Sequence, residues 1–209
     1  MSNIAHKRAT MTLFCDVNDI ESHRVRIVVA EKGVNVDITE VTRDEMPREV
    51  LELNPYQTLP MLLDRDLVLY QANVIMEYLD ERFPHPPLLP VYPVMRAKNR
   101  LMIHRIERDW YSLARNILEK NDAQSRDRLT ESLVAIAPVF AEKPFFLSEE
   151  YTMVDCCISA LLWRLPEYGI ELPAKAKPIM DYAERVFERE AFQASLTETE
   201  REIQEPLYV

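Results

Sequence analysis

The sequence predicts a two-part fold, an α/β domain of order βαβαββα followed by an all-helical domain. Three observations lead to this prediction. In residues 10–83, segments of alternating apolar residues, typical of strands, are interspersed with helical patterns. A proline-rich segment at 84–92 interrupts both patterns, and residues 93–209 show helical patterns alone. We therefore expect a first domain over residues 1–83, a linker over 84–92 and a helical domain over 93–209.

The first three elements form a βαβ unit. Residues 10–15 (TMTLFC) alternate apolar and polar side chains, which predicts a strand, and residues 34–41 return to the same period. Between them, the valines of 22–32 recur at helical spacing. Ser22 is the predicted N-cap of this helix. Gly33 is predicted to end it, because glycine tolerates the left-handed conformation common at helix C-termini.

Four shorter elements complete the first domain. A short helix is predicted at 49–53, and it ends before a proline. Two short apolar runs at 60–63 and 67–70 predict a hairpin, and a helix at 71–82 follows. The proline-rich segment after that helix is predicted to be a stiff connector, because each proline lacks an amide donor and favours extended geometry in its predecessor.

The rest of the chain is predicted to be helical. Apolar residues recur at helical spacing in four segments, 93–120, 124–141, 152–165 and 178–190, and a weaker helical tail follows. The chain contains only two glycines, which suits a helix-rich protein with tight connections.

Composition excludes several classes of protein. The formal net charge of −10 argues against direct nucleic-acid binding, because binding phosphates requires a basic face. No stretch approaches eighteen apolar residues and the N-terminus has no apolar signal-peptide core, so we expect a cytoplasmic protein without a membrane span. The three cysteines and four histidines show neither a disulfide framework nor metal-ligand spacing, so we expect no metal and no cofactor.

One predicted helix is basic although the chain is acidic. Residues 84–130 carry nine Lys or Arg against five Asp or Glu. Five of these cations crowd the first predicted helix of the second domain: Arg96, Lys98, Arg100, Arg105 and Arg108. Two interpretations stay open, a solvated helix face and a docking face for an acidic partner.

Two motifs in this order resemble the cytosolic glutathione transferase superfamily. Thr58-Leu59-Pro60 is similar to the turn in which that superfamily has a cis-proline, and residues 152–155 (TMVD) resemble the capping motif of its helical domain. The resemblance covers the whole chain. It implies a glutathione transferase-like fold, in which the first domain is thioredoxin-like and the second is a helical bundle. It also implies a two-fold homodimer.

The residues that bind and activate glutathione in that superfamily are replaced. The activating hydroxyl or thiol would lie near Asp19, whose carboxylate would raise the pKa of a neighbouring thiol. The Glu-Ser pair that holds the glutamyl group reads Gln71-Ala72. Leu59, Pro60 and these three residues are therefore vestigial glutathione-site positions. The alternative is a zeta- or omega-like isomerase or thiol transferase that uses Ser22 or Cys15.

Residues 77–88 and 90–94 show a narrower resemblance, to the RNA polymerase-associated starvation proteins of this superfamily. From composition alone, Pro84, His85 and Pro86, which we call the Pro-His-Pro segment, would be part of a linker. The resemblance instead implies that this segment, with Tyr92 added, contacts the RNA polymerase holoenzyme and its housekeeping sigma factor. It implies a non-catalytic regulator of transcription under starvation and stress, with no contact to DNA.

Overall fold

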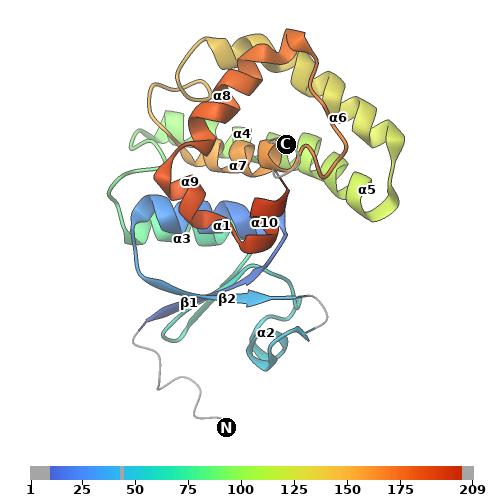
Figure 1. Cartoon of the computed structure of the whole chain (residues 1–209). Coiled ribbons are helices and arrows are strands. Elements are labelled where there is room, and N and C mark those ends of the chain that lie inside the picture. Colours follow the sequence, from blue (N-terminus) through green and yellow to red (C-terminus); the bar gives the residue numbers. More distant parts are fainter. Residues whose placement is uncertain (1–9, 43–44, 204–209) are drawn as a thin grey trace. The chain divides into compact units, whose positions relative to one another are not determined.

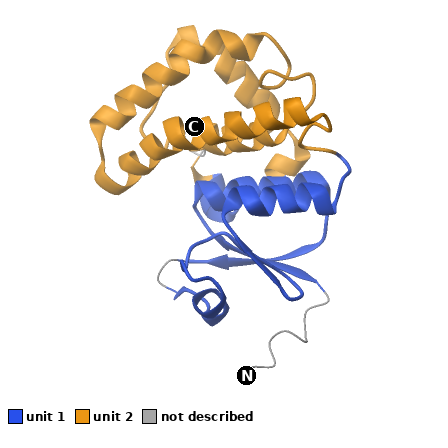
Figure 2. Ribbon diagram, turned by 180° about the vertical axis from the view of Figure 1, so that it is seen from behind, with its two compact units in different colours: residues 1–86, 194–201 blue, residues 87–193, 202–209 orange. Residues whose placement is uncertain are grey.

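The computed structural model describes residues 10–42 and 45–203 of the chain. The chain divides into two compact units (Figure 2). Unit 1 comprises residues 1–86 and 194–201, and unit 2 comprises residues 87–193 and 202–209. Unit 1 thus includes a segment from near the C-terminus, a region that the sequence patterns assign to the helical domain.

A four-stranded mixed sheet forms the centre of unit 1. The strands are β1 (Met11–Asp16), β2 (Val36–Val41), β3 (Met61–Asp64) and β4 (Leu67–Tyr70), in the order β2-β1-β3-β4. β1 pairs with β2 in parallel, and it pairs with β3 antiparallel. β3 and β4 form the expected hairpin. The predicted α/β order of this domain is confirmed.

Helices cover both faces of this sheet (Figure 1). Helices α1 (Ile20–Lys32) and α3 (Ala72–Arg82) pack against each other on one face, and the short α2 (Arg48–Leu53) lies on the other. The core on the α2 side is built from alternate strand residues and one helix residue: Phe14, Val41, Val50, Met61 and Leu63. This alternation is what the period of two in the sequence predicts.

Helix α1 begins earlier than its sequence pattern indicates. Asp19, not Ser22, is its N-cap, and its carboxylate accepts a hydrogen bond of 2.8 Å from the Ser22 amide. The Ser22 hydroxyl reaches back instead and accepts from the Asp16 amide at 3.0 Å. Aspartate and serine are both good N-cap residues, so residue type alone does not decide which of them starts the helix. The path of the preceding loop decides it. The predicted stop is correct, since Gly33 adopts a φ of 58°.

Unit 2 begins with a long interrupted helix. Its parts are α4 (Pro93–Ile106), the π-helical segment η2 (Glu107–Tyr111) and α5 (Ser112–Lys120). The helix predicted at 93–120 is therefore continuous in space but contains a wider π turn, which period analysis does not detect. The chain returns antiparallel through α6 (Ala123–Ile136) and the 3₁₀ segment η3 (Ala137–Ala141).

The centre of unit 2 is the buried helix α7 (Met153–Trp163). Its start is the predicted capping box: the Thr152 hydroxyl accepts from Val154, and the Asp155 carboxylate accepts from the Thr152 amide at 2.8 Å. Cys156 and Cys157 are fully buried within it, as packing residues are. Helices α4 and α8 (Lys177–Phe187) pack against it, and the 3₁₀ segment η4 (Ala174–Ala176) leads into α8.

Two short helices end the described chain. α9 (Glu190–Ser195) spans the point at which the chain passes from unit 2 to unit 1, and α10 (Glu198–Glu202) follows. None of the helices in the described residues is both long and apolar enough to cross a membrane.

Candidate functional site

Two of the predicted glutathione-site positions, Pro60 and Gln71, lie in one row with Cys15 at one end of the sheet of unit 1. Phe14 pairs with Met61, and Met61 pairs with Tyr70. Continuing this antiparallel register by one residue places Cys15, Pro60 and Gln71 in one row. The Leu59-Pro60 peptide bond is cis. Segments far apart in the sequence therefore form one edge of the sheet.

The start of α3 at this edge lacks the groups that would hold an amino acid. Gln71 has a φ of 77°, a left-handed conformation that is strained for a residue with a side chain, and its side chain makes no capping hydrogen bond. Ala72 is buried and has no hydroxyl. The helix N-terminus therefore offers backbone amides but neither a carboxylate nor a hydroxyl.

The loop after β1 offers no exposed nucleophile. The carboxylate of Asp19 and the hydroxyl of Ser22 are both used in the local hydrogen bonds that start α1, and Ser22 is 0% exposed. Ser22 is thus brought to the edge, but its oxygen points into the backbone of the loop. Asp19 supplies a cap to the helix, which explains its presence without any role in chemistry.

Cys15 is also fully buried, and burial raises the pKa of its thiol to about 12. The guanidinium of Arg26 opposes this shift only in part. Neither His23 nor Arg24 is the charge that lowers the pKa of the thiol; the turn of the helix brings the guanidinium of Arg26 to it instead. Since the thiolate is the nucleophile, this cysteine is poorly suited to catalysis.

We expect Cys15 to resist alkylation in the folded protein. With a pKa of about 12, roughly one thiol in 10⁴ is ionised at pH 8. Labelling with iodoacetamide, followed by peptide mapping, should be at least about a hundredfold slower in buffer than in denaturant. Fast labelling of Cys15 in the folded chain would contradict this, and the same chain unfolded in urea is the control.

The Pro-His-Pro segment follows α3, and a lysine at the end of α1 holds it in place. The Lys32 ammonium at the end of α1 donates to the Asp80 carboxylate at 2.5 Å and to the Pro86 carbonyl. The side chain of Lys32 is 0% exposed. The His85-Pro86 bond is cis, and Pro84, His85 and Pro86 are all exposed. The segment is thus anchored through its backbone while its side chains face solvent.

The other predicted contact residues lie in unit 2. The Tyr92 side chain is 76% exposed at the start of α4. Arg96 donates to the Pro90 carbonyl at 3.0 Å, so it holds the chain that leads into the helix. The other four cations of the basic helix are exposed: Lys98, Arg100, Arg105 and Arg108. Both interpretations of the basic helix are compatible with this exposure.

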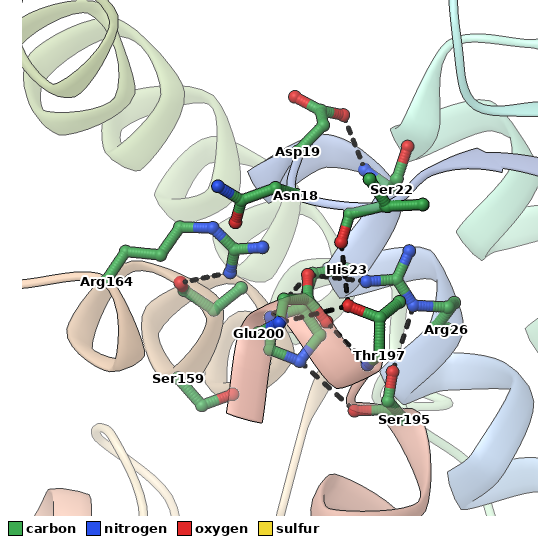
Figure 3. A network of polar contacts seen from close by, with 12 residues as sticks. Asn18, Asp19, Ser22, His23, Arg26, Ser159, Arg164, Ser195, Thr197 and Glu200 are labelled. Carbon is green, nitrogen blue, oxygen red and sulfur yellow. Dashed lines mark hydrogen bonds and ion pairs between the residues drawn. The ribbon is translucent and has the colours of Figure 1, made fainter. Parts of the chain in front are cut away.

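Sequence patterns missed a buried polar network that fixes the C-terminal segment onto unit 1 (Figure 3). Arg26 donates to Glu200 at 2.5 Å and to the Ser195 carbonyl at 2.9 Å. His23 lies 3.1 Å from the Ser195 hydroxyl. The Thr197 hydroxyl donates to the Val17 carbonyl at 2.7 Å. These contacts hold the segment against α1 and the loop after β1.

A local signal could have located half of this network. Thr197 and Glu200 form a reciprocal pair, in which the Glu200 amide donates to the Thr197 hydroxyl and the Thr197 amide donates to the Glu200 carboxylate, both at 3.1 Å. This is the S/T-x-x-E capping pattern. Its partners Arg26 and His23 lie more than 170 positions away, and nothing local marks them. Within the described part of the chain, no group of three or more potential metal ligands gathers.

The fold and two family matches define the class of protein. Residues 9–81 match the model of the glutathione S-transferase N-terminal domain, and residues 94–190 match that of the C-terminal domain. A tau-class glutathione S-transferase from mango has a TM-score of 0.80 at 23% identity, covering 94% of this chain and 96% of its own. A theta-class enzyme from Xanthomonas axonopodis, solved with glutathione bound, has a TM-score of 0.78 at 22% identity, covering 90% and 97%.

Sequence relatives identify the branch of this class. The stringent starvation protein A homolog of Coxiella burnetii is 52% identical, over 95% of this chain and 97% of that protein. The homolog of Pasteurella multocida is 51% identical over 94% of each. The chain belongs to the stringent starvation protein A family, a starvation-related branch of the glutathione transferase fold. The family predicted from residues 77–94 is confirmed.

Proposed function

We propose that this protein is a transcription regulator of the starvation response that binds RNA polymerase and has no glutathione transferase activity. It contacts the holoenzyme, including the housekeeping sigma factor, through protein surfaces in the cytoplasm. The chain itself does not bind nucleic acid, in keeping with its net charge of −10. The contact surface is the Pro-His-Pro segment, with Tyr92 as an addition.

One observation supports this proposal above all: the exposed imidazole of His85 lies on a loop whose backbone is already held in place. Lys32 holds the Pro86 carbonyl, and the flanking prolines restrict the backbone of His85. A fixed loop loses little conformational entropy on binding, so more of the contact energy becomes affinity. This is the arrangement expected of a protein-binding residue.

The lack of catalysis is inferred from three features of the sheet edge. The hydroxyl of Ser22 is committed to a backbone hydrogen bond, and the thiol of Cys15 is buried with a raised pKa. Gln71 and Ala72 supply neither the charge nor the hydroxyl for a glutamyl group. Each lost hydrogen bond to a charged group costs about 1.5–3 kcal/mol, and two such losses weaken binding by roughly a hundredfold or more.

The proposal is tested by affinity capture from starved cells. The tagged chain, expressed at its natural level, should recover RNA polymerase with sigma factor after nuclease treatment, because the contact is between proteins. Recovery that disappears with nuclease treatment, or the absence of polymerase, would contradict the proposal. A homodimeric scaffold without a polymerase role and the enzymatic alternative would then be the remaining interpretations.

Calorimetry with glutathione separates this proposal from the enzymatic alternative. We expect no saturable heat with the natural chain at millimolar glutathione, because the glutamyl contacts are missing. The variant Gln71→Glu, Ala72→Ser restores both groups and is expected to gain binding. Micromolar binding by the natural chain, with turnover of a thiol substrate, would establish the isomerase or thiol transferase alternative.

We also propose a homodimer. Helix α4 exposes an apolar face, with Val94 68% and Leu101 59% exposed seven residues apart on the same side of the helix. On α3, Val74 is 49% exposed, although the periodicity of 71–82 suggests that it is buried. Such side chains mark surfaces that pack against another protein. We expect sedimentation equilibrium to give a molecular mass of twice 24.5 kDa. A mass equal to that of a single chain would contradict the dimer.

A further inference from the structure

Unit 2 contains an open hollow that the proposed polymerase contact does not use. Its volume is about 700 Å³, within the range of small-molecule sites. It lies where the π-helical segment η2 and α5 face α6. Its charged and polar lining consists of Arg108, Asp109, Ser112, Asn116, Arg128, Glu131 and Ser132. π-Helical turns occur often at functional sites, because the wider turn shifts the side chains that follow it.

The charged residues of the hollow follow one another in a definite order. Trp110 donates to Ser132 at 2.9 Å, which fixes the antiparallel register of the two helices. In this register Arg128 lies level with residue 114 and Glu131 level with residue 111. The order along the groove is therefore Arg128, Glu131, Asp109, Arg108. Arg128 and Arg108 are offset by roughly 9 Å along the helix axis, and the positions of the two carboxylates fall between them along this axis.

These four charges are not neutralised by the described part of the protein. None of them forms an ion pair with another described residue, although opposite charges line the same hollow. The Ser132 hydroxyl accepts from Trp110, which leaves its own proton to donate to a ligand. The Asn116 carbonyl oxygen accepts from Lys120, which leaves its amide protons. The Asn116 amide thus lies next to Arg128 along the groove, and the Ser132 hydroxyl lies level with the two carboxylates at its centre.

We propose that this hollow binds an α-amino dicarboxylic acid, of which glutamate is the simplest probe. The pattern of positive ends and a negative centre complements a ligand with two carboxylates and one ammonium. Each guanidinium can bind a carboxylate in a bidentate manner, and the ammonium lies against Glu131 and Asp109. The site lies within unit 2 and does not involve the sheet edge or the Pro-His-Pro segment.

The test is a titration of the full chain with L-glutamate, followed by ¹⁵N NMR. Saturable shifts are expected at residues of η2, α5 and α6. Arg128→Ala should weaken binding at least about tenfold, since it removes one bidentate contact. The matched control is Arg115→Ala, which removes an exposed arginine of α5 that does not line the hollow. No saturable shift, or an equal loss in both variants, would overturn the proposal.

Comparing a second ligand with glutamate tests the charge pattern in the natural chain. This test does not depend on whether Arg128→Ala folds. Glutarate has the same two carboxylates but no ammonium, so it should bind at least about fivefold more weakly than glutamate. Glu131→Gln should weaken glutamate binding and strengthen glutarate binding, because it removes a negative charge from the centre. Equal binding of the two ligands, or a parallel change in Glu131→Gln, would show that the order of charges does not select the ligand.

Discussion

Replacing His85 with alanine is expected to reduce recovery of RNA polymerase with the captured chain by at least about tenfold. The imidazole is the only side chain of the Pro-His-Pro segment that can both donate and accept hydrogen bonds. Residues presented on a fixed backbone at the centre of an interface often contribute more than about 1.4 kcal/mol, which is tenfold in affinity. Quantitative immunoblotting of captured polymerase subunits measures the effect.

The control for this substitution is His104→Ala. His104 is an exposed histidine on α4, outside the Pro-His-Pro segment, so its loss should leave recovery unchanged. Both variants should unfold at the temperature of the natural chain, because both side chains are exposed. If His85→Ala recovers as much polymerase as His104→Ala, the site assignment is wrong even if the chain still binds polymerase elsewhere.

Lys32→Met is expected to cost about 3–5 kcal/mol in the free energy of unfolding. The side chains of Lys32 and Asp80 are 0% and 7% exposed, so the substitution leaves a carboxylate buried without its cation. It also removes the donor to the Pro86 carbonyl and thereby releases the Pro-His-Pro segment. Urea unfolding of the purified chain measures the loss of stability, and capture at a temperature where the variant is folded should show weakened polymerase binding.

Two comparisons identify the cause of that loss. Lys177 and Asp181 form an exposed pair four residues apart, so Lys177→Met should cost less than about 1 kcal/mol. The double variant Lys32→Met, Asp80→Leu removes both buried charges and should recover part of the stability. If Lys32→Met were as mild as Lys177→Met, the buried pair would not be the anchor of the segment.

Sequence patterns predicted the elements well because each depends on neighbours in the chain. Strand alternation, the helical period of 71–82 and the capping box at Thr152 are all visible within a few residues. The cap of α1 was misplaced by three residues because Asp19 and Ser22 are equally suited to that position. The π segment was missed because one wider turn barely disturbs the apolar period.

The contacts that determine the site could not be predicted because their partners are distant. The pair Asp80-Glu81 looks like a solvated helix end, whereas Asp80 is buried against Lys32, 48 positions earlier. Arg26 contacts Glu200 across 174 positions. Burial changes the chemistry of a charged residue, and a sequence shows burial only for regular apolar faces. The proposed vestigial site needs no distant partners for its prediction, since it is defined by residue types at fixed positions.

The C-terminal segment that completes unit 1 has a consequence for synthesis of the protein. Domains usually fold in order as they leave the ribosome. Here Arg26 and His23 stay without the contacts of Ser195 and Glu200 until nearly the entire chain has been made. Unit 1 is translated first but can be completed only last. A nascent chain stalled before residue 195 would therefore expose charged residues that the finished protein buries, which makes it a substrate for chaperones or proteases.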